Sequence, residues 1–339
     1  MKKLYSIILI GIVCSSFAQK TQKENLEKND MVDNKHLPEE VIVASRPMQP
    51  FVSAEAVKAS MEYLASDELQ GRATGSEGIE KAAVFIEKYF IENDIQPYFE
   101  TYRDSFNLKD IIGYNIVGLV EGNDPKLKNE YIILGGHYDH IGFGKEVNGD
   151  KIANGANDDA SGTIAAMKFG KYFAKSKSNK RSILITLYAA EEMGLKGSAH
   201  LAERLKSKGI NAYTMINFEM IGVPRAEDKS MAYMSGYNRS NFAKTLNKYA
   251  DNEVVGFFPG AKKMNLFMRS DNFPFYKQLG IPAHAISTFD FTNYKYYHHV
   301  DDEADKMDYK HMANFINHMI PALEGMMNAP TKEVVLRDE

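Results

Sequence analysis

Apolar residues recur along the chain in two patterns, one with a helical period and one in short extended runs. In the segment 75–93, Ile79, Ala83, Ile86 and Phe90 are spaced by four, three and four residues, which predicts an amphipathic helix. Runs rich in β-branched and aromatic residues, each bounded by turn residues, predict strands. The predicted strands cover 114–120, 131–135, 183–188, 213–218 and 281–286.

Further helical stretches lie between or after these strands. They cover 161–175 and 197–207, and a closing helix is predicted from Met312 to Leu323, where Pro321 is expected to introduce a kink. Strands that alternate with helices are typical of an α/β fold in which helices cover both faces of a sheet. The pattern therefore predicts a single three-layer α/β domain with a central, mostly parallel mixed β-sheet flanked by helices.

The first residues of the chain have the pattern of an export signal. Two lysines precede an apolar run from Leu4 to Cys14, and a small-x-small cleavage pattern ends at Ala18. This predicts a signal peptide over 1–18 and an exported protein, periplasmic or extracellular. Lipid attachment through Cys14 is the less favoured alternative, because Val13 stands where a lipoprotein signal has a small residue. The apolar run is too short to cross a membrane, so no transmembrane span is expected.

Composition narrows the functional classes further. The chain has 41 basic and 45 acidic residues and no local basic patch, so we expect no nucleic-acid partner. Cleavage after Ala18 would remove two lysines and the sole cysteine, leaving 39 basic against 45 acidic residues, a charge of −6, and no thiol chemistry. The polar segment 19–50 is predicted to be a linker, 51–330 the folded domain, and 331–339 a charged tail.

Histidine and carboxylate side chains gather directly after the predicted strands. In α/β sheets, functional residues collect where strands end at their carboxyl edge. Neighbouring carboxylates at such an edge are costly to bury unless a cation balances them. Two histidines and three carboxylates without a thiol suit zinc, with manganese and cobalt as alternatives. The donor-bearing loops are those that contain His137, Asp158, Glu191 and Glu192, Glu219, and His298.

Taken together, these motifs resemble the co-catalytic di-zinc aminopeptidases of metallopeptidase clan MH, which include glutaminyl cyclases and the glutamate carboxypeptidase type. The likeness runs from about Tyr63 to Asp308. The resemblance implies a zinc-peptidase fold of the phosphorylase-like type, with 51–330 as the catalytic domain and two zinc ions per chain. The motifs that carry it are SDELQGR, HYDH, NDDASG, AEEMGLKGS, NFEMIG, RSDNFPF, GIP and YHHVDD.

The resemblance also implies a set of metal ligands. His137 and Glu219 would bind one zinc, Glu192 and His298 the other, and Asp158 would bridge the two. The family most often has aspartate where Glu219 stands, so this glutamate departs from the family pattern. Its extra methylene still permits a carboxylate ligand at the first metal.

Two residues are implied to act in catalysis. Glu191 would be the general base, and the hydroxyl of Tyr297 would donate to the oxyanion, unless Tyr297 is only a packed aromatic residue. Side chains alternate along a strand, so the chain must turn at Glu191 and Glu192 for both to serve one site. The peptide bond between Asp158 and Asp159 is implied to be cis.

Several neighbours are expected to support the site. Asp139 and Asp302 are predicted either to fix the tautomers of the histidines or to cap loops. His140 and His299 either assist the site or lie on the surface. Asp67 and Arg72 match the opening segment of the family, and an ion pair between them that holds a loop explains them equally well. The other histidines are assigned to structure: His36, His200, His284, His311 and His318.

The preferred interpretation is a secreted zinc aminopeptidase that acts on peptides with a free N-terminus. A glutaminyl cyclase is the nearest alternative, although that branch has a tryptophan just before the last ligand histidine. This chain has Tyr297 there and no tryptophan at all. A non-catalytic binding module on the same fold is the third alternative.

Overall fold

The structure is a computed structural model that describes residues 50–225 and 230–337. The predicted signal peptide at 1–18 and the predicted linker up to residue 49 lie outside the described residues. Within the described part, no helix is both long and apolar enough to cross a membrane.

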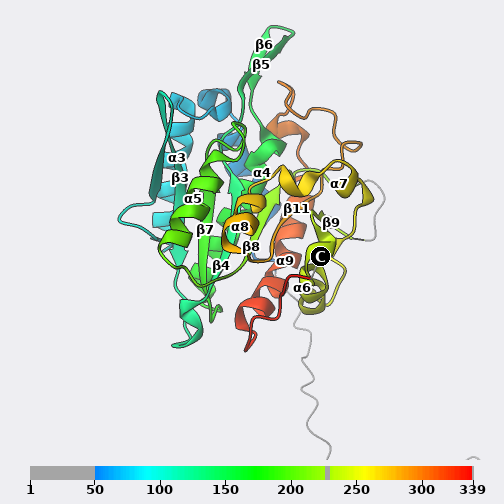
Figure 1. The fold of residues 1–339 in the computed structure, drawn as a ribbon. Coiled ribbons are helices and arrows are strands. Elements are labelled where there is room, and N and C mark those ends of the chain that lie inside the picture. Colours follow the sequence, from blue (N-terminus) through cyan, green and yellow to red (C-terminus); the bar gives the residue numbers. More distant parts are fainter. Residues whose placement is uncertain (1–49, 226–229, 338–339) are drawn as a thin grey trace, which may run out of the picture. The chain divides into compact units, whose positions relative to one another are not determined.

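A mixed sheet forms the middle layer of the fold (Figure 1). Its strand order is β1-β3-β7-β4-β8-β11-β9-β10, and β2 pairs with β3 outside this path. The four central strands β7, β4, β8 and β11 are parallel, while β3 and β9 pair antiparallel with β7 and β11. The predicted mostly parallel mixed sheet is therefore confirmed. The strands are β1 (Gln96–Pro97), β2 (Arg103–Leu108), β3 (Ile111–Val120), β4 (Tyr131–His137), β7 (Ser182–Tyr188), β8 (Ala212–Glu219), β9 (Ala232–Met234), β10 (Val255–Gly256) and β11 (Ala283–Ser287).

Helices cover both faces of this sheet, which gives the three predicted layers (Figure 1). Ile132 and Leu134 belong to the core beneath α4 and α9, whereas Ile133 between them belongs to the core beneath α5 and α8. This division follows from the alternation of side chains along a strand. The helices are α2 (Ala54–Leu64), α3 (Glu77–Glu92), α4 (Ser161–Ser176) and α9 (Tyr309–Asn328) on one side, and α5 (Lys196–Ser207) and α8 (Asn272–Leu279) on the other; α6 (Phe242–Ala250) packs on α9, and α7 (Pro259–Lys263) is short.

The ends of the described elements differ from those of the predicted ones by a few residues in either direction. The periodic segment at 75–93 is α3, and the predicted closing helix is α9, which contains Pro321 and continues to Asn328. The short edge strands, the α2 helix and the elements between residues 232 and 279 are not among the predicted elements. The strands β1, β9 and β10 have only two or three residues each, too few for a pattern, whereas α2 and α6 have 11 and 9 residues and an apolar face that the sequence analysis does not identify.

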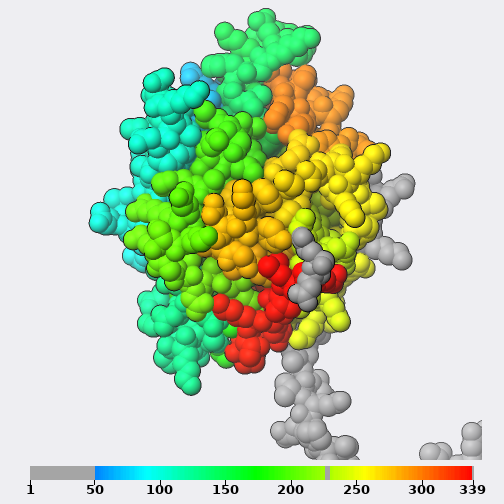
Figure 2. All heavy atoms as spheres, in the orientation of Figure 1, coloured from blue at the N-terminus to red at the C-terminus, as the bar shows by residue number. Residues whose placement is uncertain are grey.

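A separate hairpin joins two of the donor-bearing loops. It consists of β5 (Gly142–Val147) and β6 (Asp150–Ala153), which pair antiparallel. Figure 2 shows it projecting from the top of the face formed by α5 and α8. The hairpin connects the HYDH loop to the NDDASG loop, so both loops leave the sheet edge at the same place.

The segment after residue 330 packs on the folded body up to the last described residue. The side chain of Val334 is buried, and its N–H donates a hydrogen bond of 2.8 Å to the hydroxyl of Tyr213. Leu336 forms a β-bridge with Ser240. Residues 331–337 are therefore part of the folded domain, and the charged segment predicted there is not a free tail.

Candidate functional site

The five predicted metal residues come together at the carboxyl edge of the sheet. Strand β4 ends at His137 and β8 ends at Glu219, and the two strands are parallel neighbours. Asp158 lies in the turn just before α4, and Glu192 follows β7. Parallel strands bring their following loops to one edge, which explains how residues far apart in sequence meet here.

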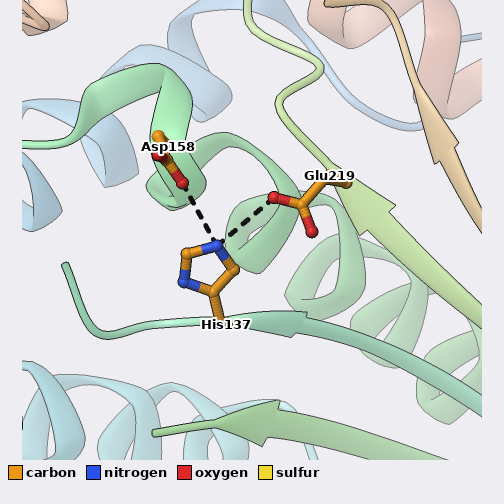
Figure 3. Close-up of side chains that lie close together, drawn as sticks. All are labelled: His137, Asp158 and Glu219. Atoms are coloured by element: carbon orange, nitrogen blue, oxygen red, sulfur yellow. Dashed lines mark hydrogen bonds and ion pairs between the residues drawn. The ribbon is translucent and has the colours of Figure 1, made fainter. Parts of the chain in front are cut away.

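The first donor group consists of His137, Asp158 through Oδ1, and Glu219. His137 Nε2 lies 3.2 Å from Asp158 Oδ1 and 3.3 Å from Glu219 Oε1 (Figure 3). The three donor atoms all lie within 4.8 Å of one another. Both carboxylates thus face the same ring nitrogen, as they would around a shared cation.

Polar neighbours hold this group in place. His137 Nδ1 lies 3.1 Å from the carbonyl oxygen of Asp139, which orients the ring with Nε2 toward the donors. The hydroxyl of Ser270 and the amide of Asn217 donate to Glu219 Oε2 at 2.8 Å and 3.0 Å. Ser270 and Asn217 have no role in the sequence analysis, because a single hydroxyl or amide carries no pattern that marks it as a partner of Glu219.

The second donor group consists of His140, Asp158 through Oδ2, Glu192 and His298. His298 Nε2 lies 3.2 Å from Asp158 Oδ2 and 3.1 Å from Glu192 Oε2. His140 Nδ1 lies 3.0 Å from Glu192 Oε1. His140 is therefore part of the site, and the surface position considered for it is wrong; its neighbour His299, by contrast, has a side chain that is 38% exposed.

The unpaired atoms of this site test whether a cation fits it. Among the described residues, no group makes a hydrogen bond of normal geometry with Asp158 Oδ2, Glu192 Oε1 or either ring nitrogen of His140, although all four atoms are buried and charged neighbours lie close. Buried polar atoms without partners are costly, and a divalent cation between them would remove that cost. Nitrogen and oxygen donors without a thiol fit zinc. Asp158 directs one oxygen at each group, which fits a carboxylate shared by two metals.

Hydrogen bonds to Asp302 hold the loop that carries Asp158 in place. The peptide bond between Asp158 and Asp159 is cis, as the resemblance implied. Asp302 accepts hydrogen bonds from the N–H groups of Asn157 and Asp158 at 2.8 Å and 3.1 Å, and from the hydroxyl of Tyr294 at 2.6 Å. Of the two roles considered for Asp302, the structure supports the loop cap.

Arg72 links several of these loops, but not through the predicted ion pair. Its guanidinium is fully buried and donates to the carbonyl oxygens of Tyr138, Asn154 and Gly155 at 2.8, 2.6 and 2.9 Å, and also to that of Leu64. Asp67 instead accepts from the side chain of Asn154 at 2.7 Å. The expected pairing of Asp67 with Arg72 is wrong, because the arginine satisfies backbone carbonyls.

The two adjacent glutamates contribute to different parts of one site because the chain turns there. The chain turns after β7, and Ala190 adopts a left-handed conformation with φ of 56°. Glu192 consequently faces His140 and His298, whereas Glu191 lines a neighbouring pocket. Burial raises the pKa of Glu191 well above its usual range, and the nearby carboxylates of Asp271 and Glu219 raise this pKa further.

The pocket beside Glu191 has aromatic walls and an empty volume of about 540 Å³. The ring of Tyr297 stacks on that of His298, with centroids 4.0 Å apart, and on that of Phe289, with centroids 5.5 Å apart. Burial raises the pKa of Tyr297, so its hydroxyl keeps its proton at neutral pH and remains a hydrogen-bond donor. Further lining residues are Tyr233, Leu266, Arg269, Ser270 and Phe291.

Asp271 is a further buried carboxylate near the site. It belongs to the RSDNFPF motif, and burial raises its pKa to about 8. Among the described residues, neither of its carboxylate oxygens has a hydrogen-bond partner that meets normal geometry. The motif marks the segment, but sequence alone gives no sign that Asp271 lies next to Glu191.

Comparison with known families decides the classification. The sequence model of peptidase family M28 matches residues 115–323, which include every residue of both donor groups. The chain therefore belongs to peptidase family M28. This confirms the resemblance to clan MH and, at the level of the family, the prediction of a zinc metallopeptidase.

Curated relatives of this M28 chain carry names of the same kind. It is 31% identical over 191 residues to a "Probable zinc metalloprotease" of Pyrenophora teres f. teres, covering 52% of this chain and 38% of the relative. It is 38% identical over 114 residues to a "Probable zinc metalloprotease" of Pyrenophora tritici-repentis, covering 33% of this chain and 25% of the relative. The aligned part thus spans well under half of these relatives.

Solved structures share the fold of this M28 chain. The LapA aminopeptidase of Legionella pneumophila matches with a TM-score of 0.63 at 20% identity, covering 82% of this chain and 73% of that one. The glutaminyl cyclase of Fimbriiglobus ruber matches with a TM-score of 0.63 at 19% identity, covering 86% of this chain and 99% of that one. Because peptidase and cyclase match equally well, these likenesses establish the fold alone.

Proposed function

We propose that this protein is an exported zinc-dependent aminopeptidase that releases N-terminal residues from peptides with a free N-terminus. The observation that carries the proposal is the separation of Glu191 from Glu192. Glu192 joins the second donor group, while Glu191 is a buried carboxylate with a raised pKa that lines the neighbouring pocket. A general base next to a metal pair is one arrangement that supports peptide hydrolysis.

The donor groups account for two metals. His137 and Glu219 would hold one zinc ion, Glu192 and His298 the other, and Asp158 would contribute one oxygen to each. Bound zinc supplies Lewis acidity that polarises a carbonyl group and lowers the pKa of water. The carbonyl oxygen of Asp139, which accepts from His137, and the hydrogen bonds that Ser270 and Asn217 donate to Glu219 support the first group in this role.

Glu191 moves the proton in this proposal. Its carboxylate takes a proton from the water whose oxygen attacks the scissile carbonyl carbon. As the carbon–nitrogen bond breaks, Glu191 passes this proton to the leaving amine. Tyr297 keeps its proton and donates a hydrogen bond to the oxyanion, a contribution of about 2–4 kcal/mol for donors of this type.

The pocket suits a free N-terminus. Among the described residues that line it, Glu191 is the carboxylate not assigned to a metal, and it would attract an ammonium group. Phe289 and Leu266 belong to its apolar part and would receive the side chain of the N-terminal residue. A substrate held in this way presents its first peptide bond, and no later one, to Glu191.

Metal analysis combined with a substrate panel tests the proposal. Protein beginning at Gln19 should contain two zinc ions, hydrolyse aminoacyl anilides and lose this activity to a chelator. An N-acetylated anilide is the matched control and should not be hydrolysed. One zinc ion with cyclisation of an N-terminal glutaminyl peptide would identify a cyclase, and full zinc content without turnover of either substrate would identify a binding module.

A further inference from the structure

We propose that His140, through Nδ1, is an additional ligand of the second zinc ion, beside Glu192, His298 and the shared Asp158. This assignment rests on the proposed zinc-dependent function. The ligand set implied by the family resemblance has five members and does not include His140. The structure gives the second metal one more imidazole than that set provides.

The position of His140 is fixed by its surroundings. Its N–H donates to the carbonyl oxygen of Arg72 at 3.3 Å, and Arg72 in turn donates to Tyr138 and Gly155 on either side of the hairpin. A side chain at Gly155 would place its first carbon 2.5 Å from the imidazole ring of His140. The ring is thus packed against backbone, and only 1% of the residue is exposed.

The positions of the donor atoms indicate that they bind one shared ion and not each other. His140 Nδ1 lies only 3.0 Å from Glu192 Oε1, yet neither atom has a hydrogen-bond partner of acceptable geometry among the described residues. The two atoms are close without being aimed at each other. Asp158 Oδ2, which lies 3.9 Å from His140 Nδ1, is also without a partner.

The spacing of these atoms suits zinc. Tetrahedral zinc with bonds of about 2.0–2.2 Å holds neighbouring ligand atoms about 3.3–3.6 Å apart. The separations of 3.0 Å and 3.9 Å from His140 Nδ1 bracket this range. The donor atoms of His140, Asp158 and Glu192 all lie within 4.8 Å of one another, so one ion reaches all three.

The competing role for His140 is that of a hydrogen-bond partner for Glu192. In that role Nδ1–H would point at Glu192 Oε1, which the geometry of the pair does not support. His137 shows the contrast, because its Nδ1 faces the carbonyl oxygen of Asp139 and leaves only Nε2 for a metal. His140 has no such backbone acceptor for either nitrogen within the described part of the chain.

X-ray absorption of the zinc-loaded protein tests the assignment directly. We expect three imidazoles per two zinc ions in the wild type and two in His140→Ala. His299→Ala, which removes the exposed neighbouring histidine, should keep three. Competition with a chelator should show the affinity for one zinc ion reduced at least about 10-fold in His140→Ala, since loss of even an outer partner of a metal ligand costs 10–100-fold.

Each outcome has a distinct meaning. Two imidazoles per two zinc ions in the wild type overturns the assignment, and this measurement needs no variant to fold. A reduced zinc affinity of His140→Ala with an unchanged imidazole count also overturns it, and makes His140 a partner of Glu192. Fewer than two zinc ions in the wild type would instead overturn the proposed di-zinc function, and the His140 assignment with it.

Discussion

The two donor groups share Asp158 but are built in different ways. In the first group, the protein holds the outer atoms of the donors: Asp139 orients His137, and Ser270 and Asn217 hold Glu219. In the second group, Glu192 Oε1 and both nitrogens of His140 have no hydrogen-bond partner among the described residues.

The difference follows from where the donors lie in the fold. His137 and Glu219 are the last residues of β4 and β8, so the ladder of the sheet fixes their backbone. His140, Glu192 and His298 lie in loops, and His298 adopts a left-handed φ of 54°. Strand ends therefore fix the backbone of the first group, whereas loops carry the second group, whose unpaired donor atoms would gain a partner from a cation.

Removal of the metals should have the largest effect. A chelator is expected to abolish aminopeptidase activity, and added zinc should restore it, because both donor groups serve one reaction. In the metal-free protein, hydrogen exchange should increase most in the loops around His140, Glu192 and His298, and least in β4 and β8. Equal increases in strands and loops would contradict the comparison between the two groups.

Glu191→Gln should have the next largest effect. The amide cannot take a proton from water, so turnover should fall at least about 100-fold while both zinc ions remain bound. Glu203→Gln, an exposed glutamate on α5, is the matched control and should change neither quantity. Lost metal together with retained activity would show that Glu191 and Glu192 have each other's roles.

Substitutions of Glu219 show whether this residue is a metal ligand or has only a structural role. Glu219→Gln removes the negative charge and should lower metal affinity and activity together, by about 10–100-fold in affinity. Glu219→Asp should stay active, because aspartate is the residue that the family most often has there. A variant Glu219→Gln with normal zinc affinity but lower thermal stability would remove Glu219 from the first group.

The pH dependence of the metal-free protein should show the smallest effect. The carboxylates of Asp158 and Glu192 raise the pKa of His298 to about 10, against about 6.5 for histidine in an unfolded chain. Protonated His298 therefore stabilises the folded state fully below pH 6.5, and this stabilisation is lost as the pH rises through 10. The melting temperature should fall across this range, and less so in His298→Gln.

Zinc-loaded protein provides the control for this experiment. Bound zinc requires a neutral imidazole, so protonation of His298 no longer contributes to its stability. Deprotonation of His298 should therefore cause no fall in the melting temperature of the loaded protein between pH 6.5 and 10. The same slope with and without zinc would mean that His298 does not face the metal.

The sequence predicts the parts of this molecule that have strong local patterns. Strands β4, β7 and β8 are apolar runs buried on both faces, so their hydrophobicity identifies them without knowledge of their partners. His137 and Glu219 are the last residues of β4 and β8, and Glu192 comes shortly after β7. The short β5–β6 hairpin has no comparable apolar pattern, because most of its residues are at least partly exposed.

Contacts between distant loops are the part that the sequence does not predict. From the sequence, Arg72 is expected to pair with a carboxylate. In the structure it donates to four backbone carbonyl oxygens, and this depends on how the HYDH loop and the hairpin meet. From the sequence, Asp302 is a candidate partner for His298. In the structure it accepts hydrogen bonds from the N–H groups of Asn157 and Asp158. In both cases the residue type indicates a polar contact, and only the fold decides which group receives it.

A crystal structure of the zinc-loaded protein, with anomalous scattering recorded at the zinc edge, tests the central claim most directly. The account predicts two zinc peaks, one bounded by His137, Asp158 and Glu219, and one bounded by Asp158, Glu192, His298 and His140. The carboxylate of Glu191 should lie outside both coordination shells and face the pocket. A single peak, or a peak that has Glu191 as a ligand, would contradict the two-group description of the site.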